Sequence, residues 1–323
     1  MPEDPRKGQV LIIGAVVLVV LGIFAALTID AGNVFQARAR LQNSADAAVL
    51  AAAHKMMEER NIAATEQTSR QLATTEAQKF VNANWNAARF EIAFGRYDGG
   101  GVFVVQDSST QAQAVRVKTV RDKTAPGGPL GAFFAHLVGI KVFDLSATSI
   151  CKMSSGVWKI RYGLSPFAVF KDSLVPPGQT MKIYTDDQVV PGNVGLLNLD
   201  GGNLATPDLA EWIRNGYNGE ITIDPVTHYV YFYGDCGIRS SLKDDVASRM
   251  GDVIVICVYD QVSAQGSNAL FRIIKFTAVT LTGMRLTGNN KYIEARVERA
   301  VNVADCETAT WLTDNLAKIQ LAY

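Results

Sequence analysis

An unbroken run of apolar residues lies near the N-terminus of the chain. Residues 10–29 have the sequence VLIIGAVVLVVLGIFAALTI, which contains no charged side chain. A helix rises about 1.5 Å per residue, so twenty residues span about 30 Å, the thickness of the hydrocarbon core of a bilayer. Arg6 and Lys7 precede the run, and Asp30 ends it. We therefore predict a transmembrane helix over residues 10–29.

A cleaved secretory signal is the alternative interpretation of this run. Such a signal usually has an apolar region of about 7–15 residues, followed by small residues in an A-x-A pattern. The nearest such pattern, Ala37-Arg38-Ala39, lies well beyond the run and within a helical pattern. The sequence therefore favours a retained anchor.

The short basic tail indicates the orientation of the anchor. Arg6 and Lys7 favour a cytoplasmic tail over residues 1–9, although Arg38 and Arg40 lie within reach on the other side. Long translocated regions weaken the charge rule, so the short tail is expected to decide the orientation. We predict a single-pass protein of the cytoplasmic (inner) membrane, with its N-terminus inside and its bulk periplasmic or extracellular.

A helical pattern continues beyond the apolar run, through a segment rich in alanine. Apolar or small residues recur at steps of three, four and seven, at Val34, Leu41, Ala45, Ala48 and Ala52. This pattern predicts one helix from the membrane to about Glu59, within a helical stalk over residues 30–90. The small residues permit close approach to a partner helix or to the body of the protein. A solvated stalk with high helix propensity is the alternative, and the sequence leaves both open.

Patterns typical of β-strands begin after residue 90. Segments 90–97 and 102–106 flank Asp-Gly-Gly-Gly, which predicts a hairpin because glycine supplies the positive φ of a tight turn. Residues 114–120 alternate apolar and basic side chains, and residues 142–151 form a further predicted strand. Between them, residues 130–138 predict a short helix that carries Phe133, Phe134 and Leu137. We expect a small α+β unit over residues 91–155.

Residues 156–323 alternate short β-type segments with turn-rich spacers. Strands are predicted at 159–169, 180–184, 194–199, 220–223, 229–233, 252–259, 271–282 and 292–300. Two helices interrupt them: one with Thr206 as N-cap and Pro207 at the first helical position, the other opened by Ser241 with Asp244 three residues later. Many short strands fit a sandwich or partly closed barrel. The predicted fold class is α+β: a transmembrane helix that continues into a long stalk helix, followed by a β-rich exported body.

Charge and composition exclude several classes of function. The chain has 31 Lys+Arg and 31 Asp+Glu, so it lacks the basic surplus of a nucleic-acid-binding protein. Its 48% of hydrophobic residues supports a folded body and argues against a disordered chain. Three histidines, and four cysteines without a CxxC spacing, argue against a His-rich metal site, a zinc ribbon or a thioredoxin-type site. We predict no cofactor and no nucleic-acid partner.

The four cysteines all follow the apolar run, at Cys151, Cys236, Cys257 and Cys306. In an oxidising compartment an even number permits two disulfides, with three connectivities. Cys257 lies in an apolar strand pattern and is also explained as a small buried hydrophobic residue. Cys236 and Cys306 lie in predicted loops and are the better candidates. We predict at least one disulfide in the exported body.

Catalytic motifs are absent from the sequence apart from weak matches. There is no phosphate-binding loop, G-x-S-x-G, HExxH or GxGxxG. The S-x-x-K match at residues 240–243 has no accompanying S-D-N or K-T-G, and helix capping explains its serines. Residues 200–203, Asp-Gly-Gly-Asn, fit a turn better than a calcium loop, which needs about six oxygen ligands. Asp107-Ser108-Ser109 lacks the final serine of a metal-dependent adhesion site. The sequence therefore predicts no enzymatic activity.

The N-terminal segment carries an ordered series of residues around the apolar run. In order, the series is Lys7, Gly8, Gln9, the apolar helix, Asp30, Gly32, Arg38, Arg40, Leu41, Gln42, Ala45, Asp46, Ala47 and Ala48. It resembles the N-terminal segment of TadG-like proteins of the Tad (tight adherence, Flp pilus) system. Residues 114–151, AVRVKTVRDKTAPGGPLGAFFAHLVGIKVFDLSATSIC, resemble a second block of the same proteins. The resemblance is strong over residues 6–55 and looser beyond residue 158.

This resemblance implies a membrane-anchored envelope protein that contributes to pilus assembly or surface attachment. The implied partners are the membrane, other envelope or pilus-assembly proteins, and further copies of the chain through the N-terminal helix. Two alternatives remain: a pilin-like subunit of an extracellular filament, and a membrane-tethered hydrolase with an unrecognised site.

Prepilin-type substrates are cut after a glycine and usually carry Glu as the fifth residue of the mature chain. Lys7-Gly8 fits such a junction, but the fifth residue after it is Ile13. A Glu there would provide an electrostatic register between subunits, since a buried charge needs a partner in the membrane. We therefore predict that Met1–Gly8 is retained and that the chain does not form the shaft of a pilus.

Overall fold

The computed structural model describes residues 6–60, 65–98, 101–185, 194–202, 204–235, 237–263, 269–303, 305–309, 312 and 315–322. For residues 6–11 and for Val138 and Val194 it describes the backbone alone. Contacts divide the chain into two compact units. The first comprises residues 1–52, 70–151 and 321–323, and the second comprises residues 53–69 and 152–320. Residues 30–52 and 70–90 of the predicted stalk belong to the first unit, whereas residues 53–69 belong to the second.

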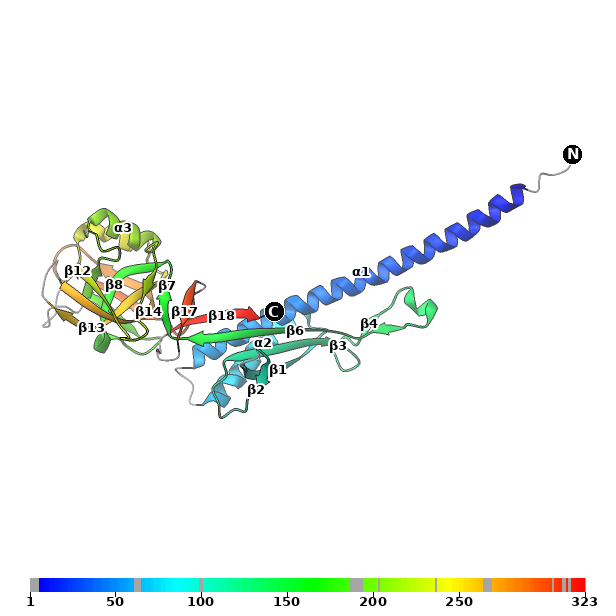
Figure 1. The fold of residues 1–323 in the computed structure, drawn as a ribbon, viewed down its shortest axis with the longest axis horizontal. Helices are drawn as coiled ribbons and strands as arrows, with labels where there is room; N and C mark the ends of the chain where they lie inside the picture. Colours follow the sequence, from blue (N-terminus) through cyan, green and yellow to red (C-terminus); the bar gives the residue numbers. More distant parts are fainter. Residues whose placement is uncertain are drawn as a thin grey trace. The chain divides into compact units, whose positions relative to one another are not determined.

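The N-terminal helix α1 runs without a break from Arg6 to Glu59, a length of 54 residues (Figure 1). It therefore continues the predicted membrane helix to the predicted helix end at about Glu59. No proline interrupts it, and alanine, leucine, glutamine and arginine give its second half high helix propensity. A second helix, α2 (Glu66–Trp85), follows in the segment that was predicted to be helical.

A sheet forms the centre of the first unit, with the strands in the order β6-β3-β1-β2. Its strands are β1 (Arg89–Tyr97), β2 (Phe103–Val105), β3 (Ala114–Arg121) and β6 (Leu145–Ser155). Strand β1 is antiparallel to both β2 and β3. The predicted hairpin is present, since Gly95 pairs with Val105 and Tyr97 with Phe103. Gly95 has no room for a side chain, because a Cβ there would overlap the carbonyl oxygen of Val104.

The segment between β3 and β6 differs from the predicted short helix over residues 130–138. It forms a small hairpin of β4 (Leu130–Gly131) and β5 (Val142–Phe143), with the 3-10 helix η1 (Ala135–Val138) between them. Gly139 ends η1 with a φ of 91°, which glycine adopts at low cost. The helical turn is thus shorter than its aromatic and apolar residues suggested.

The second unit contains a seven-stranded sheet in the order β12-β10-β8-β13-β14-β15-β9, with a further pairing of β12 to β14. That pairing closes β12, β10, β8, β13 and β14 into a ring, so the second of the two predicted architectures, a sandwich or a partly closed barrel, is the one present. Strand β8 runs parallel to β13, and the other pairs are antiparallel. The bounds are β8 Leu164–Phe170, β9 Thr180–Thr185, β10 Val194–Leu197, β12 Val230–Asp235, β13 Val253–Ser263, β14 Ala269–Arg285 and β15 Tyr292–Val297.

The long strand β14 makes this closure possible. Its first residues pair with β12, and its last residues pair with β15, while β13 pairs along most of its length. Register shifts near Tyr259 in β13 mark bulges, which bend a strand and increase its twist. The ring of Phe271 fills the space beside Gly195 and Gly234, where a Cβ would lie 2.5 Å and 3.0 Å from ring atoms. Large and small residues on neighbouring strands thus complement one another in the barrel core.

Short elements complete the second unit. A three-stranded sheet has the order β11-β7-β17, with β7 Val157–Ile160, β11 Ile221–Thr222 and β17 Cys306–Thr308. The remaining elements are β16 Val301–Asn302, β18 Leu316–Ala322, η2 Lys171–Ser173, α3 Thr206–Asn215, η3 Ser240–Leu242 and α4 Lys243–Ala247. Strands β16, β17 and β18 were not predicted.

The two predicted helices of this unit are present, but their predicted N-caps are wrong. Ala205 is the N-cap of α3, and Thr206 is its first residue. Ser241 lies within the single turn η3, and the N-cap of α4 is Leu242. Neither N-cap makes a side-chain hydrogen bond, so packing of Leu209, Trp212 and Ile213 against the barrel holds α3 in place.

Candidate functional site

The first half of α1 is the part of the described chain that can cross a membrane. Within the described residues, one helix is long and apolar enough for this by length and composition, and it is α1. The described side chains of residues 12–29 are exposed on every side of the helix, with Ala26 partly covered. A helix that is apolar all round is stable only in a core or in lipid. Gly8 and Gln9 lie where the backbone alone is described.

Asp30 is the first charged residue after the apolar run, and its side chain is buried. Its carboxylate accepts the backbone N–H groups of Phe133, Phe134 and Ala135, at 2.8, 3.0 and 2.5 Å. These donors lie at the start of η1, so Asp30 holds the β4–β5 hairpin against α1. Burial opposes ionisation, but the three N–H donors outweigh it, and the pKa of Asp30 is lowered.

Beyond Asp30, one face of α1 packs against the body of the first unit. Ala37, Leu41, Ala45 and Ala48 are buried on this face. Leu41 forms a small core with Ala37, Ala88 and Leu145. The buried hydroxyl of Thr119 on β3 donates to the carbonyl oxygen of Leu41 at 2.9 Å. The alanine-rich stripe therefore serves close packing of α1 on its own sheet, which is one of the two functions left open by the sequence.

The other residues of the N-terminal series lie on the remaining faces of α1. Gln42 donates to the carboxylate of Asp46 one turn later, at 2.8 Å. Arg38 and Arg40 are exposed. A Cβ at Gly32 would meet no atom within 4 Å, so packing within this chain does not require glycine there.

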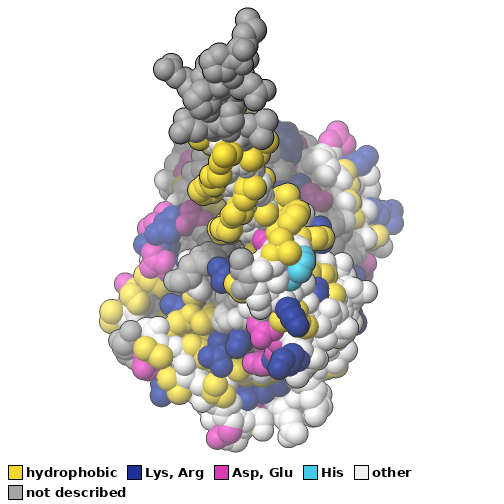
Figure 2. All heavy atoms as spheres, turned by 90° about the vertical axis from the view of Figure 1, so that its right-hand side faces the viewer, with side chains coloured by type: hydrophobic (Ala, Val, Ile, Leu, Met, Phe, Trp, Pro, Cys, Tyr) yellow, Lys and Arg dark blue, Asp and Glu magenta, His cyan; other side chains and the backbone are white. Residues whose placement is uncertain are grey.

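An apolar groove lies between α1 and the β4–β5 hairpin. Its walls come from α1 residues 23–38 and from the hairpin, where the lining residues are Phe134, Ala135, Leu137, Ile140 and Phe143. Asp30 lies in its wall, with its negative charge stabilised by hydrogen bonds from backbone N–H groups. Figure 2 shows apolar side chains gathered on α1 and a second apolar cluster beside them. The sequence patterns indicated Asp30 and Phe134 separately but did not bring them together.

The described cysteines are buried and do not pair with one another. Cys151, Cys257 and Cys306 are thiols in the described part of the chain, and Cys236 lies outside it. Complete burial raises the pKa of the Cys257 thiol, so this residue acts as a small hydrophobic side chain in β13, as one interpretation of the sequence had it. The predicted disulfide stays a prediction.

The weak catalytic and metal motifs form turns in the structure. The carboxylate of Asp200 accepts the N–H of Gly202 at 2.9 Å, and that of Asp107 accepts the N–H of Ser109 at 2.9 Å. Ser240 and Lys243 of the S-x-x-K match are exposed. Over the described residues, no three His, Cys, Asp or Glu side chains are placed to hold a metal ion.

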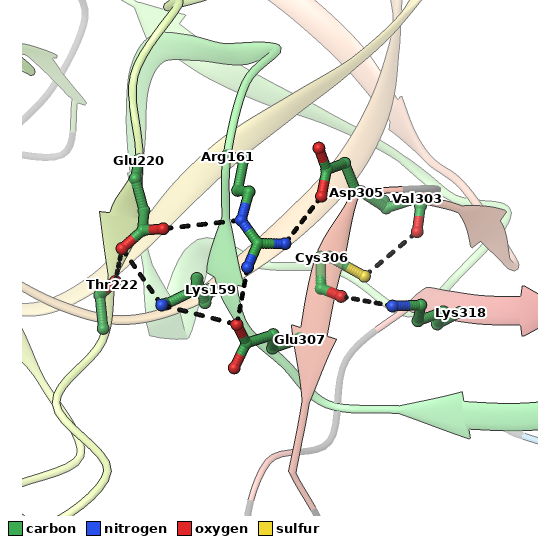
Figure 3. A network of polar contacts seen from close by, with 9 residues as sticks. All are labelled: Lys159, Arg161, Glu220, Thr222, Val303, Asp305, Cys306, Glu307 and Lys318. Atoms are coloured by element: carbon green, nitrogen blue, oxygen red, sulfur yellow. Dashed lines mark hydrogen bonds and ion pairs between the residues drawn. The ribbon is translucent and has the colours of Figure 1, made fainter.

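A network of ion pairs covers the three-stranded sheet of the second unit (Figure 3). Arg161 contacts Asp305 at 2.8 Å and Glu307 at 3.0 Å, and Lys159 contacts Glu220 at 3.1 Å. These side chains are between 19% and 49% exposed and join β7, β11 and the segment around β17. The network links strands that share few main-chain pairs. We therefore assign it a structural role.

Nearly the whole of α1 coincides with a known domain. Residues 8–55 match the family described as "Putative Flp pilus-assembly TadE/G-like". Residues 8–55 carry a TadE/G-like domain. The match confirms the resemblance found in the sequence and supports a pilus-related role for a membrane-anchored envelope protein. Neither the curated proteins nor the solved structures contain a match to this chain.

The TadE/G-like domain corresponds to α1 alone, without the sheet or the barrel. It begins two residues after the start of the helix and ends four residues before its end. It includes the apolar run, Asp30 and the alanine-rich face. The match therefore covers the apolar run and the packing face of α1, and the sheet and the barrel lie outside it.

Proposed function

We propose that this chain is a non-enzymatic anchor protein that contributes to the assembly of a Flp-type pilus from the cell envelope. The TadE/G-like domain over residues 8–55 carries this proposal. In it, residues 10–29 span the inner membrane with the N-terminus inside. The rest of α1 and both compact units lie outside the cytoplasm and offer binding surface to other envelope or pilus proteins.

The division of α1 into two halves supports this arrangement. The first half exposes apolar side chains all round, and the second half is buried along one face by its own sheet. A continuous helix transmits position rigidly, because each residue is hydrogen-bonded to the next turn. The anchor thus holds the first unit at a fixed distance from the membrane surface.

Deletion of the gene in its own host tests the proposed role. We expect loss of pili and of surface attachment, with recovery on complementation by the full chain. A complementing variant with Leu18→Arg and Val19→Arg, which places charges in the apolar run, should fail to restore either. Normal pili in the deletion strain would contradict the proposal.

A pilin-like subunit is the second candidate, and one observation favours it. The exposed apolar half of α1 could pack against copies of itself as well as against lipid. That function requires purified filaments in which this chain is the major subunit, with residues 10–36 buried between copies. Absence of the chain from purified filaments would exclude it.

A further inference from the structure

The β4–β5 hairpin of the first unit exposes several large apolar side chains. Phe133 is 62% exposed, Leu137 is 75% exposed and Ile140 is 47% exposed. Exposed apolar side chains are common singly, but a contiguous group marks an interaction surface. The hairpin does not use them to build the core of its own unit.

The position of this group relative to the anchor follows from the groove. Leu137 and Ile140 line the same groove as Ile23 and Leu27 of α1. Ile23 precedes Asp30 by about two helical turns, or about 10 Å along the axis. The hairpin thus lies beside the last turns of the apolar run and not beyond its end.

Hydrogen bonds fix the hairpin at this level. The carboxylate of Asp30 accepts three N–H groups at the start of η1, so the hairpin cannot slide along α1 without leaving a buried charge unpaired. Arg38 is an exposed residue among those that line the groove, and His136 and Lys141 of the hairpin are also exposed. Basic side chains beside an apolar surface are typical of the headgroup region of a bilayer.

We propose that the β4–β5 hairpin is a second membrane contact, which inserts Phe133, Leu137 and Ile140 into the outer leaflet beside the anchor helix. The occupant of the groove is lipid. The exposed apolar surface of residues 12–29 continues into the groove. A helix that spans a bilayer is surrounded by lipid, so lipid also reaches the apolar surfaces next to that helix. An interfacial element buries its apolar face about 5–10 Å deep, which matches the level of Ile23 and Leu27.

This hairpin contact rests on the proposed membrane anchoring of α1 and adds a specific lipid contact to it. Asp30 then holds the hairpin in the boundary between headgroups and acyl chains, where its own charge is satisfied by backbone donors. The first unit has two points of contact with the bilayer, and two contacts restrict its tilt in a way that one helix does not.

Depth-dependent quenching of tryptophan tests the proposal. The full chain is reconstituted into phosphatidylcholine vesicles that carry bromine on the acyl chains, either near the headgroup end or at the chain centre. Leu137→Trp and Ile140→Trp are compared with Val105→Trp, a control on β2 that is 58% exposed in the same unit. Leu18→Trp reports on the anchor. Quenching of the unsubstituted chain, which has four tryptophans, is subtracted.

We expect bromine near the headgroup end to quench the Leu137→Trp and Ile140→Trp variants severalfold more strongly than the control. Strong quenching of Leu18→Trp and none of the two hairpin variants would overturn the hairpin contact and leave the anchor intact. That result would also follow if another copy or a partner protein filled the groove. No quenching of Leu18→Trp would defeat the proposed anchoring itself, and the hairpin contact with it.

Discussion

At the scale of single residues, Asp30 has the clearest structural role in the membrane-proximal region. Its buried carboxylate ends the apolar run and receives three backbone donors from a segment more than one hundred residues later. In Asp30→Asn one acceptor becomes an NH₂ group that faces an N–H donor. We expect amide hydrogen exchange at Phe133–Ala135 to become about tenfold faster, because a local opening then costs less. Exchange mass spectrometry on the full chain in detergent measures this.

The matched control for this prediction is Asp144→Asn, which removes an exposed carboxylate just after β5. Exchange at residues 133–135 should stay unchanged in it. Equal acceleration in both variants would mean that Asp30 has no special role in holding the hairpin.

The acid dependence of the first unit is a second prediction at this scale. Asp122 accepts hydrogen bonds from Arg89 at 2.8 Å and from Thr124 at 2.7 Å. The pKa of Asp122 is lowered from 3.8, chiefly by Arg89 and then by Thr124. Because the folded-state pKa is depressed, the stabilisation is present above pH 3.8 and is lost as the pH falls through the folded-state value. The free energy of unfolding of the wild-type chain should therefore decrease as the pH is lowered, and it should decrease less steeply in the Asp122→Asn variant.

Denaturant unfolding of the first unit, followed by amide hydrogen exchange at β1 and β3, measures its free energy of unfolding. Measurements between about pH 5 and pH 2, where carboxylates titrate, give the slope of this free energy against pH for the wild type and for Asp122→Asn. Parallel slopes would contradict the assignment of this effect to Asp122. The Asp144→Asn variant serves again as the control for loss of a carboxylate.

Residues of this region could be predicted from the sequence, but their contacts could not. Asp30, Leu41 and Ala45 stood out because they belong to an ordered series around the apolar run. The partners of Asp30 are backbone N–H groups, and every residue except proline has one, so no side-chain pattern indicates them. Thr119 likewise is one of several polar residues in a strand of alternating character, and its bond to Leu41 depends on how β3 packs on α1.

At the scale of elements, the second half of α1 functions as a docking face. Ala45 is fully buried, so a larger side chain must displace its neighbours. We expect Ala45→Leu to destabilise the first unit by about 1–3 kcal/mol through overpacking. Ala39→Leu is the matched control, because Ala39 lies on the exposed face of the same helix and the two residue types have similar helix propensity.

Denaturant unfolding of the two variants measures the difference in free energy. A control as unstable as Ala45→Leu would show that the effect comes from the helix and not from its packing. If neither variant is destabilised, the alanine face does not pack closely on the sheet.

Elements with a strong local pattern were predicted well. The end of helix α1 at about Glu59 was predicted from the sequence because its composition and lack of proline are local properties. The glycine-rich turn between β1 and β2 was found for the same reason. Strands β16, β17 and β18 were missed because they are short or follow turn-rich sequence, and distant pairing partners stabilise them. The predicted N-caps of α3 and α4 were wrong because packing, and not side-chain capping, positions those helices.

At the scale of the whole molecule, the state of the N-terminus separates the candidate functions. A prepilin-type cut after Gly8 would leave Gln9 as the first residue, but the mature chain would then carry Ile13 where such subunits usually have Glu. Without that charge there is no electrostatic register for filament packing. Intact-mass spectrometry of the mature chain should therefore show that residues before Gln9 are retained. A mature N-terminus at Gln9 would favour the filament function, and one beyond Ile29 would defeat the anchor.

The membrane orientation of α1 is the central claim, and protease accessibility tests it most directly. The full chain is expressed with one epitope tag at each end, and intact spheroplasts are treated with proteinase K. We predict loss of the C-terminal tag and survival of the N-terminal tag on a short fragment that contains residues 10–29. Survival of the C-terminal tag in intact spheroplasts would contradict this orientation, whether the N-terminal tag is lost or both tags are lost only after lysis.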